Sequence, residues 1–171
     1  MTEITGRAVS AELSPNSAPT SSSKTRPDPL LPPQGSRSID EILADARSNL
    51  KRLTAVEAFN LLTSSDDEGP KILVDIRPVA QRHEEGSIEG AIIVERNVLE
   101  WRMDPRSDSR LDFVNQYDLK VVVFCSEGYT SSLAARSLQE LGLSNATDIV
   151  GGFKAWKRAK LGGVRSRLSA L

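Results

Sequence analysis

The stretch VVVFCSEGYTSS, residues 121–132, decides the fold and raises the main functional question. Residues 121–124 are β-favouring and show no alternation with polar residues, which is typical of a central strand in a parallel sheet. Cys125, the only cysteine of the chain, follows directly. A helical pattern of apolar residues occupies 131–143. Ligands of such sheets bind at the carboxyl ends of the strands, so Cys125 is a candidate site residue.

Strand and helix patterns alternate on both sides of this stretch. Short apolar runs at 71–78, 91–95 and 146–152 predict further strands. Helices are predicted at 38–53 and 54–62, where Ser38 with Glu41 and Thr54 with Glu57 have capping-box spacing. Further helical patterns begin at 79 and cover 153–159, and one or two short helices are expected within 96–118. The alternation predicts an α/β fold with a central parallel sheet and helices on both faces.

Composition suggests where the ordered part begins and ends. Residues 1–38 are rich in serine and proline and lack a sustained apolar period, so we expect a disordered tail. A phosphorylated or partner-binding tail is the alternative for this segment. Residues 39–163 are expected to form one domain. Residues 164–171 are expected to be a short basic tail, with contact to a nucleic acid or a membrane as its alternative.

Charge and cysteine usage exclude several classes of protein. The formal net charge of −1 argues against a nucleic-acid partner. No apolar run approaches the roughly 18 residues of a membrane span, so no membrane partner is expected. A single thiol and the absence of an evident secretory signal suit a reducing compartment, and we expect a cytoplasmic location. One cysteine and one histidine make a structural zinc site unexpected. No metal and no cofactor are predicted.

The loop after Cys125 has the composition of an anion site. Its small residues allow backbone N–H groups to converge, and the next helix adds the positive end of its dipole. Both effects favour a thiolate, which is the nucleophilic form of cysteine. The alternative is a buried structural cysteine, because a free thiol packs like a small apolar residue.

Three blocks of the sequence resemble the rhodanese-like (sulfurtransferase) family, single-domain type. The first is ILVDIRPVAQRHEEGSIEGAIIV, with Asp75-x-Arg77 after a strand; the second is VVVFCSEGYTSSLAARSLQELGL. The third is DIVGGFKAWKRAKL, with Gly151, Gly152 and Trp156 at the family spacing. The resemblance covers about residues 53–161 and implies the rhodanese-like three-layer fold.

The resemblance implies sulfane-sulfur transfer through a persulfide of Cys125, the catalytic residue. The donor would be thiosulfate, 3-mercaptopyruvate or a persulfide, and the acceptor a thiol, cyanide or another protein. Backbone amides of the loop would hold the anionic sulfur. The substrate-binding candidates are Ser126, Glu127, Gly128, Tyr129, Thr130, Arg96 and Arg102.

Some positions depart from the family pattern. The loop has no Arg or Lys, and Glu127 is expected to disfavour a thiolate and repel thiosulfate. Ser131 stands where related phosphatases of this fold carry the arginine of Cys-x5-Arg, which argues against phosphatase or arsenate chemistry. Arg96 or Arg102 could supply positive charge, with Trp101 as an apolar wall. The alternative places both arginines in surface ion pairs. A non-enzymatic binding module of the same fold is therefore a second hypothesis.

Other conspicuous residues have simpler interpretations. Asp75 and Arg77 are expected to order the loop ends above the sheet. His83 is expected on the surface, since nothing in the sequence places it beside Cys125. Trp156 is expected to anchor the last helix in the core.

Overall fold

The computed structural model describes residues 28–65 and 69–165. Within these ranges, four parallel strands form one sheet in the order β2-β1-β3-β4, in which β1 (Lys71–Asp75) and β3 (Lys120–Phe124) are central. Their register runs from Lys71 beside Lys120 to Asp75 beside Phe124. Both strands are buried along nearly their whole length, as expected for uninterrupted apolar runs at the centre of a sheet.

The two outer strands are shorter than the sequence predicts. β2 comprises Ile92–Ile93 and β4 comprises Thr147–Asp148, whereas the apolar runs suggested strands at 91–95 and 146–152. After β2 the backbone turns into a 3-10 helix, η1 (Arg96–Val98). After β4, Gly151 adopts a left-handed conformation with φ 75° and begins the last helix. Backbone turns rather than loss of apolar character end these two strands.

The predicted helices are present, but the first ends at Ser48 and not at residue 53 as predicted. They are α1 (Ile39–Ser48), α2 (Ala55–Thr63), α3 (Val79–Glu85), α4 (Leu99–Met103), α5 (Thr130–Glu140) and α6 (Gly152–Arg158). Both predicted capping boxes are confirmed: Ser38 and Glu41 bond reciprocally, as do Thr54 and Glu57. These reciprocal bonds satisfy backbone N–H groups that the first helical turn leaves without partners.

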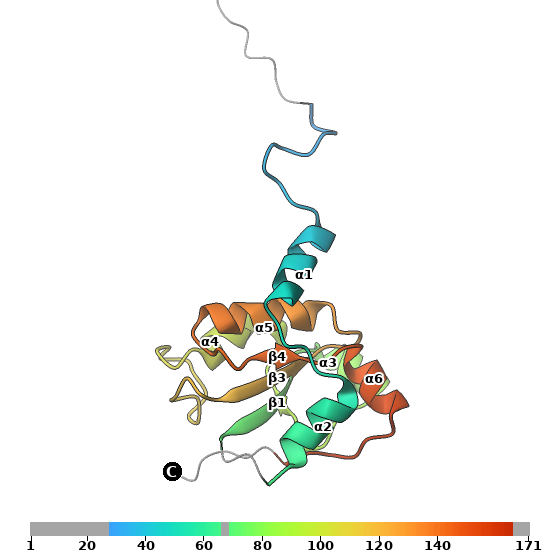
Figure 1. Ribbon diagram of the computed structural model, residues 1–171, viewed down its shortest axis with the longest axis vertical. Coiled ribbons are helices and arrows are strands. Elements are labelled where there is room, and N and C mark those ends of the chain that lie inside the picture. The colour runs from blue at the N-terminus through green and yellow to red at the C-terminus, as the bar shows by residue number, and fades with distance from the viewer. Residues whose placement is uncertain (1–27, 66–68, 166–171) are drawn as a thin grey trace, which may run out of the picture. The chain divides into compact units, whose positions relative to one another are not determined.

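Helices cover both faces of the sheet, so the structure has three layers (Figure 1). On one face, α4 and α5 pack on the strands, and α1 packs on α5. On the other face, α2 and α6 enclose a second cluster that includes Leu73, Phe124 and Trp156. Only 2% of Trp156 is exposed, which confirms its predicted place in the core. The predicted α/β architecture with a parallel sheet and two helical faces is confirmed.

The predicted domain limits can be compared only in part. The expected disordered tail lies outside the described residues up to position 27, and the chain divides into two units between Ser36 and Arg37. At the other end, the predicted basic tail lies outside the described residues from 166 onward. Val164 is buried and its N–H donates to the Glu89 carbonyl at 2.9 Å, so the packed region extends at least to this residue. Within the described ranges, no helix is both long and apolar enough to span a bilayer.

Candidate active site

The candidate site lies where β3 ends and α5 begins. Phe124, the last residue of β3, is fully buried, whereas Cys125 directly after it is partly exposed. Residues 126–129 form a bent loop, and α5 starts at Thr130. The positive end of the α5 dipole is therefore close to the thiol. The strand thus delivers Cys125 to the edge of the sheet where this class of fold binds its ligands.

Two groups contact the sulfur atom of Cys125. The Gly128 N–H donates to Sγ at 3.2 Å, and Sγ lies 3.4 Å from Ser131 Oγ. The first contact places one loop amide where the sequence predicted an amide cradle. The second shows that Ser131, at the position of the missing phosphatase arginine, faces the thiol from the first turn of α5.

Gly128 is required by the shape of this loop. Its φ of +82° is a conformation that side chains disfavour, and a Cβ there would lie 2.8 Å from both Gly151 N and Ile149 O. Its carbonyl oxygen accepts hydrogen bonds from Arg47 Nη2 at 2.8 Å and from Arg52 Nη2 at 3.0 Å. The peptide groups on the two sides of Gly128 are thus fixed by Cys125 and by two guanidinium groups.

A buried carboxylate supports the loop from below. Asp148, at the end of β4, accepts hydrogen bonds from Ser131 Oγ at 3.0 Å and Ser132 Oγ at 2.9 Å. Arg52 Nε donates to the other carboxylate oxygen, Oδ1, at 2.7 Å, and Arg52 Nη2 donates at 3.0 Å to Oδ2, the oxygen that the two serines contact. The negative charge of Asp148, which is fully buried, is therefore paired and hydrogen-bonded. This network ties the first turn of α5 to β4.

The Asp75-x-Arg77 motif reaches the loop through Glu85. Arg77 is buried, bonds the Asp75 carboxylate through Nε and Nη2, and donates from Nη1 to Glu85 at 3.0 Å. The second Glu85 oxygen accepts from Ser126 Oγ at 2.6 Å. The Arg77 guanidinium also lies 4.0 Å from the ring centroid of Phe153. These contacts agree with the structural role expected of the motif.

Charge pairing shifts two pKa values in this network. Burial alone would lower the pKa of Arg77, but the hydrogen bonds and charges of Asp75 and Glu85 raise it above its ordinary value. Partial burial would raise the pKa of Glu85, but the hydrogen bonds from Ser126 and Arg77 hold it below its ordinary value. Both groups are thus held in their charged forms beneath the loop.

Glu127 is paired in a way that the sequence did not indicate. Its carboxylate forms an ion pair with Lys154 in the first turn of α6, and both side chains are about half exposed. The hydrogen bond and the charge of Glu127 raise the pKa of Lys154. The backbone N–H of Lys154 also donates to the Ser126 carbonyl at 3.0 Å, so α6 adjoins the loop. The negative charge of Glu127 is therefore partly balanced.

The remaining predicted site residues lie in different places. Tyr129 is 58% exposed, and the guanidinium of Arg47 lies 5.3 Å from its ring centroid. Arg96 forms an ion pair with Glu100 at 2.7 Å, as the alternative interpretation expected. Arg102 donates to the Ser109 carbonyl at 2.8 Å. The site role of Arg96 and Arg102 stays a prediction that these contacts do not support. The neighbouring Trp101 is 62% exposed.

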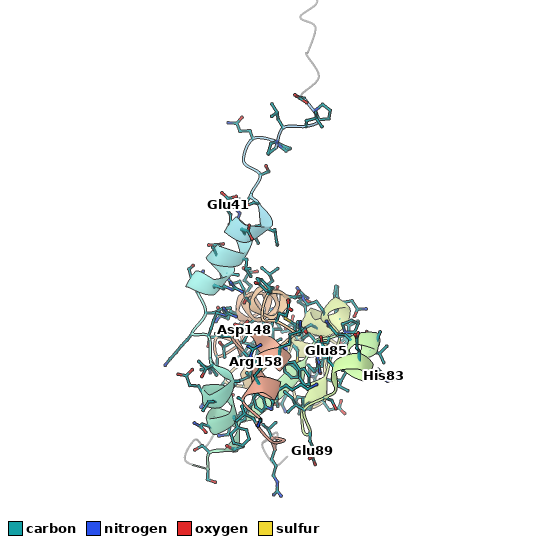
Figure 2. The ribbon with its side chains drawn as sticks, turned by 90° about the vertical axis from the view of Figure 1, so that its right-hand side faces the viewer. Glu41, His83, Glu85, Glu89, Asp148 and Arg158 are labelled. Carbon is teal, nitrogen blue, oxygen red and sulfur yellow. The ribbon has the colours of Figure 1, made fainter. Side chains whose placement is uncertain are left out.

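Residues that sequence reasoning missed supply most of the contacts to the loop: Arg47, Arg52, Glu85, Asp148 and Lys154. For Arg47 a signal existed, because its spacing from Leu43 and Leu50 places it on the apolar face of α1. Asp148 is buried and Glu85 is half-buried, whereas His83 is exposed as predicted and is labelled at the edge of the domain in Figure 2. No cluster of three or more metal-binding side chains occurs among the described residues.

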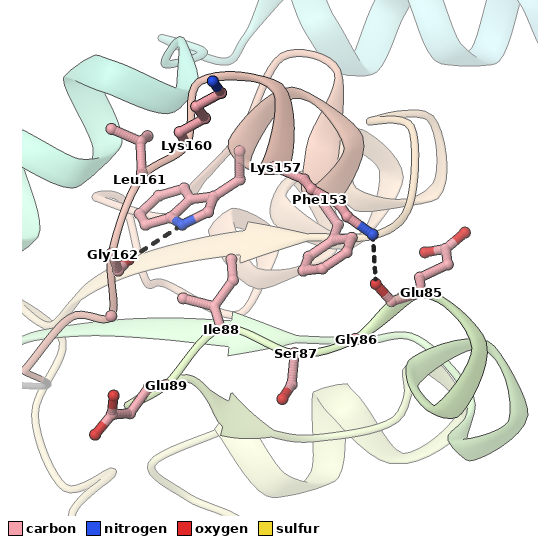
Figure 3. Close-up of a pocket in the computed structure, with 12 residues that line it drawn as sticks. Glu85, Gly86, Ser87, Ile88, Glu89, Phe153, Lys157, Lys160, Leu161 and Gly162 are labelled. Carbon is pink, nitrogen blue, oxygen red and sulfur yellow. Dashed lines mark hydrogen bonds between the residues drawn. The ribbon is translucent and has the colours of Figure 1, made fainter.

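A separate pocket of about 520 Å³ lies beside this site, between residues 85–89 and the end of α6. Phe153 and Trp156 are among its apolar lining residues. The Lys157 ammonium donates to the Glu85 carbonyl at 3.3 Å (Figure 3). Cys125 is not among its lining residues. The pocket shares Glu85 with the site but does not contain the thiol.

Comparison with known proteins agrees with this geometry. The family model of the rhodanese-like domain matches residues 58–159. The adenylyltransferase and sulfurtransferase MOCS3-2 of Zea mays is 34% identical over 92 residues, covering 54% of this chain and 18% of that protein. The chain thus spans about a fifth of the length of such curated relatives.

Two solved structures extend the comparison. A protein of unknown function from Rhodopseudomonas palustris, described as a possible tyrosine phosphatase, is 32% identical with a TM-score of 0.67. The match covers 79% of this chain and 99% of that one. The thiosulfate sulfurtransferase of Pseudomonas aeruginosa shares the fold at 23% identity, with a TM-score of 0.55 and coverage of 78% and 24%. A Cys-bearing loop at the end of a central parallel strand defines an α/β protein with a thiol site. The chain belongs to the rhodanese-like domain family.

Proposed function

We propose that the protein is a sulfurtransferase that carries sulfane sulfur as a persulfide of Cys125. The observation that carries the proposal is the 3.2 Å contact between the Gly128 N–H and Cys125 Sγ, because a backbone donor there stabilises an anionic sulfur. Family membership and the sulfurtransferase names of its relatives support the same chemistry. A reducing compartment such as the cytoplasm suits a chemistry that depends on a free thiol.

The reaction proceeds in two displacement steps. The Cys125 thiolate attacks the outer sulfur of the donor, forming a new S–S bond while the donor bond breaks. With thiosulfate, sulfite leaves with the electron pair. An acceptor thiolate or cyanide then attacks the outer sulfur of the persulfide, and Cys125 leaves as a thiolate. A thiol of another protein can serve as this acceptor. No net oxidant or reductant is consumed.

The proposed substrate contacts follow from the loop. Amides of Ser126 to Thr130 hold the outer sulfur, and the exposed ring of Tyr129 forms one wall. Glu127, paired with Lys154, sets the local charge that an anionic donor meets. This pairing makes thiosulfate a more acceptable donor than the sequence of the loop alone suggests.

Phosphate-ester chemistry is not supported by the loop, although one related structure is described as a possible phosphatase. The position that would carry a phosphate-binding arginine is Ser131, whose hydroxyl bonds Asp148. A bidentate grip on phosphate is therefore missing from this position. We expect no hydrolysis of p-nitrophenyl phosphate above the level of a Cys125→Ser control.

The experiment that tests the proposal is intact mass spectrometry. The protein is incubated separately with thiosulfate, 3-mercaptopyruvate and a polysulfide. We expect a mass increase of one sulfur atom that a reducing agent removes, that Cys125→Ser lacks, and that cyanide discharges as thiocyanate. An adduct on Cys125→Ser, or no adduct with any donor, would overturn the proposal. The second outcome would favour a non-enzymatic binding module of the same fold.

A further inference from the structure

Most charged side chains around the Cys125 loop form ion pairs, but one guanidinium has no such partner among the described residues. Asp148 pairs with Arg52, Glu85 with Arg77, and Glu127 with Lys154. Arg47 also contacts the loop, but within the described ranges no carboxylate forms an ion pair with it. Arg77 also binds Asp75, so these charges balance overall, and Arg47 is a cation at the loop whose hydrogen bonds go to uncharged groups instead of a carboxylate.

Arg47 makes three contacts, two with the loop and one with the first turn of α5. Its Nη2 donates to the Gly128 carbonyl at 2.8 Å and its Nε donates to Ser132 Oγ at 3.2 Å. Its guanidinium also lies over the Tyr129 ring, 5.3 Å from the centroid. Arg47 is partly buried on α1, the helix that packs on α5. A planar guanidinium can make these contacts together, whereas an ammonium cannot reproduce their geometry.

The position of Arg47 in the chain is informative. It lies on α1, upstream of residues 58–159, which the family model matches. Arg52, the second donor to the Gly128 carbonyl, also precedes that segment. An element outside the matched domain thus holds the loop at the peptide group next to the N–H that contacts Cys125 Sγ.

We propose that Arg47 is a positioning residue of the Cys125 site, which makes α1 part of that site. Together with Arg52 it fixes the Gly128 carbonyl, so that the Gly128 N–H is held toward Cys125 Sγ. It also supplies the cation that the loop sequence lacks, which favours the thiolate over the thiol. The link to sulfur transfer rests on the proposed function, whereas the effect on the thiol does not.

The test is the pH–rate profile of Cys125 alkylation by iodoacetamide, which requires no sulfur donor. We expect Arg47→Ala and Arg47→Gln to lower the rate at neutral pH by about threefold or more, because a nearby cation is lost. The profile should move to higher pH while its limiting rate at high pH stays the same. A purely structural role would instead change the limiting rate, because access to the thiol would change.

The matched control is Arg37→Ala. Arg37 is exposed, precedes α1 and pairs with Asp45 on that helix, so we expect a wild-type profile. Arg47→Lys retains the charge but not the paired hydrogen bonds, and should give an intermediate profile. Thermal unfolding monitors folding of every variant, and Arg47→Gln provides a milder change if Arg47→Ala unfolds.

The outcomes separate this inference from the proposed function. Wild-type profiles for Arg47→Ala and Arg47→Gln would overturn the role of Arg47, whatever the protein does with sulfur donors. A shifted profile in a protein that no donor converts to a persulfide would leave Arg47 in its role and remove the sulfurtransferase function.

Discussion

Arg77 binds the carboxylate of Asp75, two residues before it, through its backbone N–H at 3.0 Å, its Nε at 2.9 Å and its Nη2 at 2.7 Å. The same local arrangement recurs at Arg106 and Asp104, with contacts at 3.0, 3.1 and 3.3 Å. The first pair is buried, whereas the side chain of Arg106 is 66% exposed. One local geometry thus occurs in two environments, which allows the effect of burial to be measured.

Arg77→Met is expected to destabilise the protein strongly. It leaves the buried Asp75 carboxylate without its cation, and removing one partner of a buried pair costs about 3–5 kcal/mol. The matched control is Arg106→Met, where we expect a loss of about 1 kcal/mol or less because exposed pairs contribute little. Urea denaturation of both variants measures the two free energies of unfolding. Equal losses would contradict the structural role of the buried pair.

Gly152 is expected to tolerate no side chain. Its φ is +54°, and a Cβ there would overlap the Cys125 carbonyl oxygen and lie 2.8 Å from the Ser126 carbonyl carbon. Gly152→Ala should lower the free energy of unfolding by about 1–3 kcal/mol, through overpacking and backbone strain. Gly162→Ala is the control, because nothing lies within 4 Å of its added Cβ. Urea denaturation distinguishes the two, and a neutral Gly152→Ala would contradict the close packing of α6 on the loop.

The sequence predicted those parts of the fold that depend on local patterns. The uninterrupted run 121–124 identified the central strand, and the Ser38 and Thr54 capping boxes identified two helix starts. The position of Cys125 after the strand followed from the same run. The outer strands were predicted too long, because apolar character continues where the backbone already turns.

The charge environment of the thiol could not be predicted in the same way. Arg47 and Gly128 are 81 residues apart in the chain, and Glu127 and Lys154 are 27 apart. No local pattern records these contacts, since they exist only after the helices have packed on the sheet. The absence of Arg and Lys from the loop was correctly observed, but the structure brings cations to it from α1 and α6.

Glu127 and Lys154 are expected to change the use of anionic donors in opposite directions. Glu127→Gln frees the Lys154 ammonium and should raise the rate of persulfide formation from thiosulfate. Lys154→Ala leaves Glu127 without its cation and should lower that rate. The effects should appear mainly in KM, because the pair is exposed and acts on donor binding. Initial rates over a range of thiosulfate concentrations measure both parameters.

The salt dependence provides the control for this electrostatic explanation. At about 1 M salt, where the Debye length is roughly 3 Å, the three proteins should differ much less. Arg136→Ala removes another exposed ion pair, with Glu140 on α5, and should behave like the wild type. Differences that persist unchanged at high salt would show that the substitutions act through loop conformation and not through charge.

The pH dependence of stability should show how much the ionised carboxylate of Glu85 contributes to the free energy of unfolding. Its pKa is held below its ordinary value of 4.5 by the hydrogen bonds from Ser126 and Arg77, which outweigh the opposing effect of partial burial. A carboxyl group with a lowered folded pKa stabilises the protein fully above its ordinary pKa. This stabilisation is lost as the pH falls through the folded value. The free energy of unfolding should therefore decrease below pH 4.5, and Glu85→Gln should decrease less steeply there.

Glu84→Gln is the matched control for this prediction, because Glu84 is the exposed neighbour of Glu85 on α3. Urea denaturation at a series of pH values, for wild type and both variants, gives the slopes. Glu85→Gln should also be less stable than the wild type at neutral pH, because it removes the charge that pairs with Arg77. If all three proteins lose stability with the same slope, protonation of Glu85 does not uncouple Arg77 from Ser126. Acid loss of stability would then have to arise from other groups.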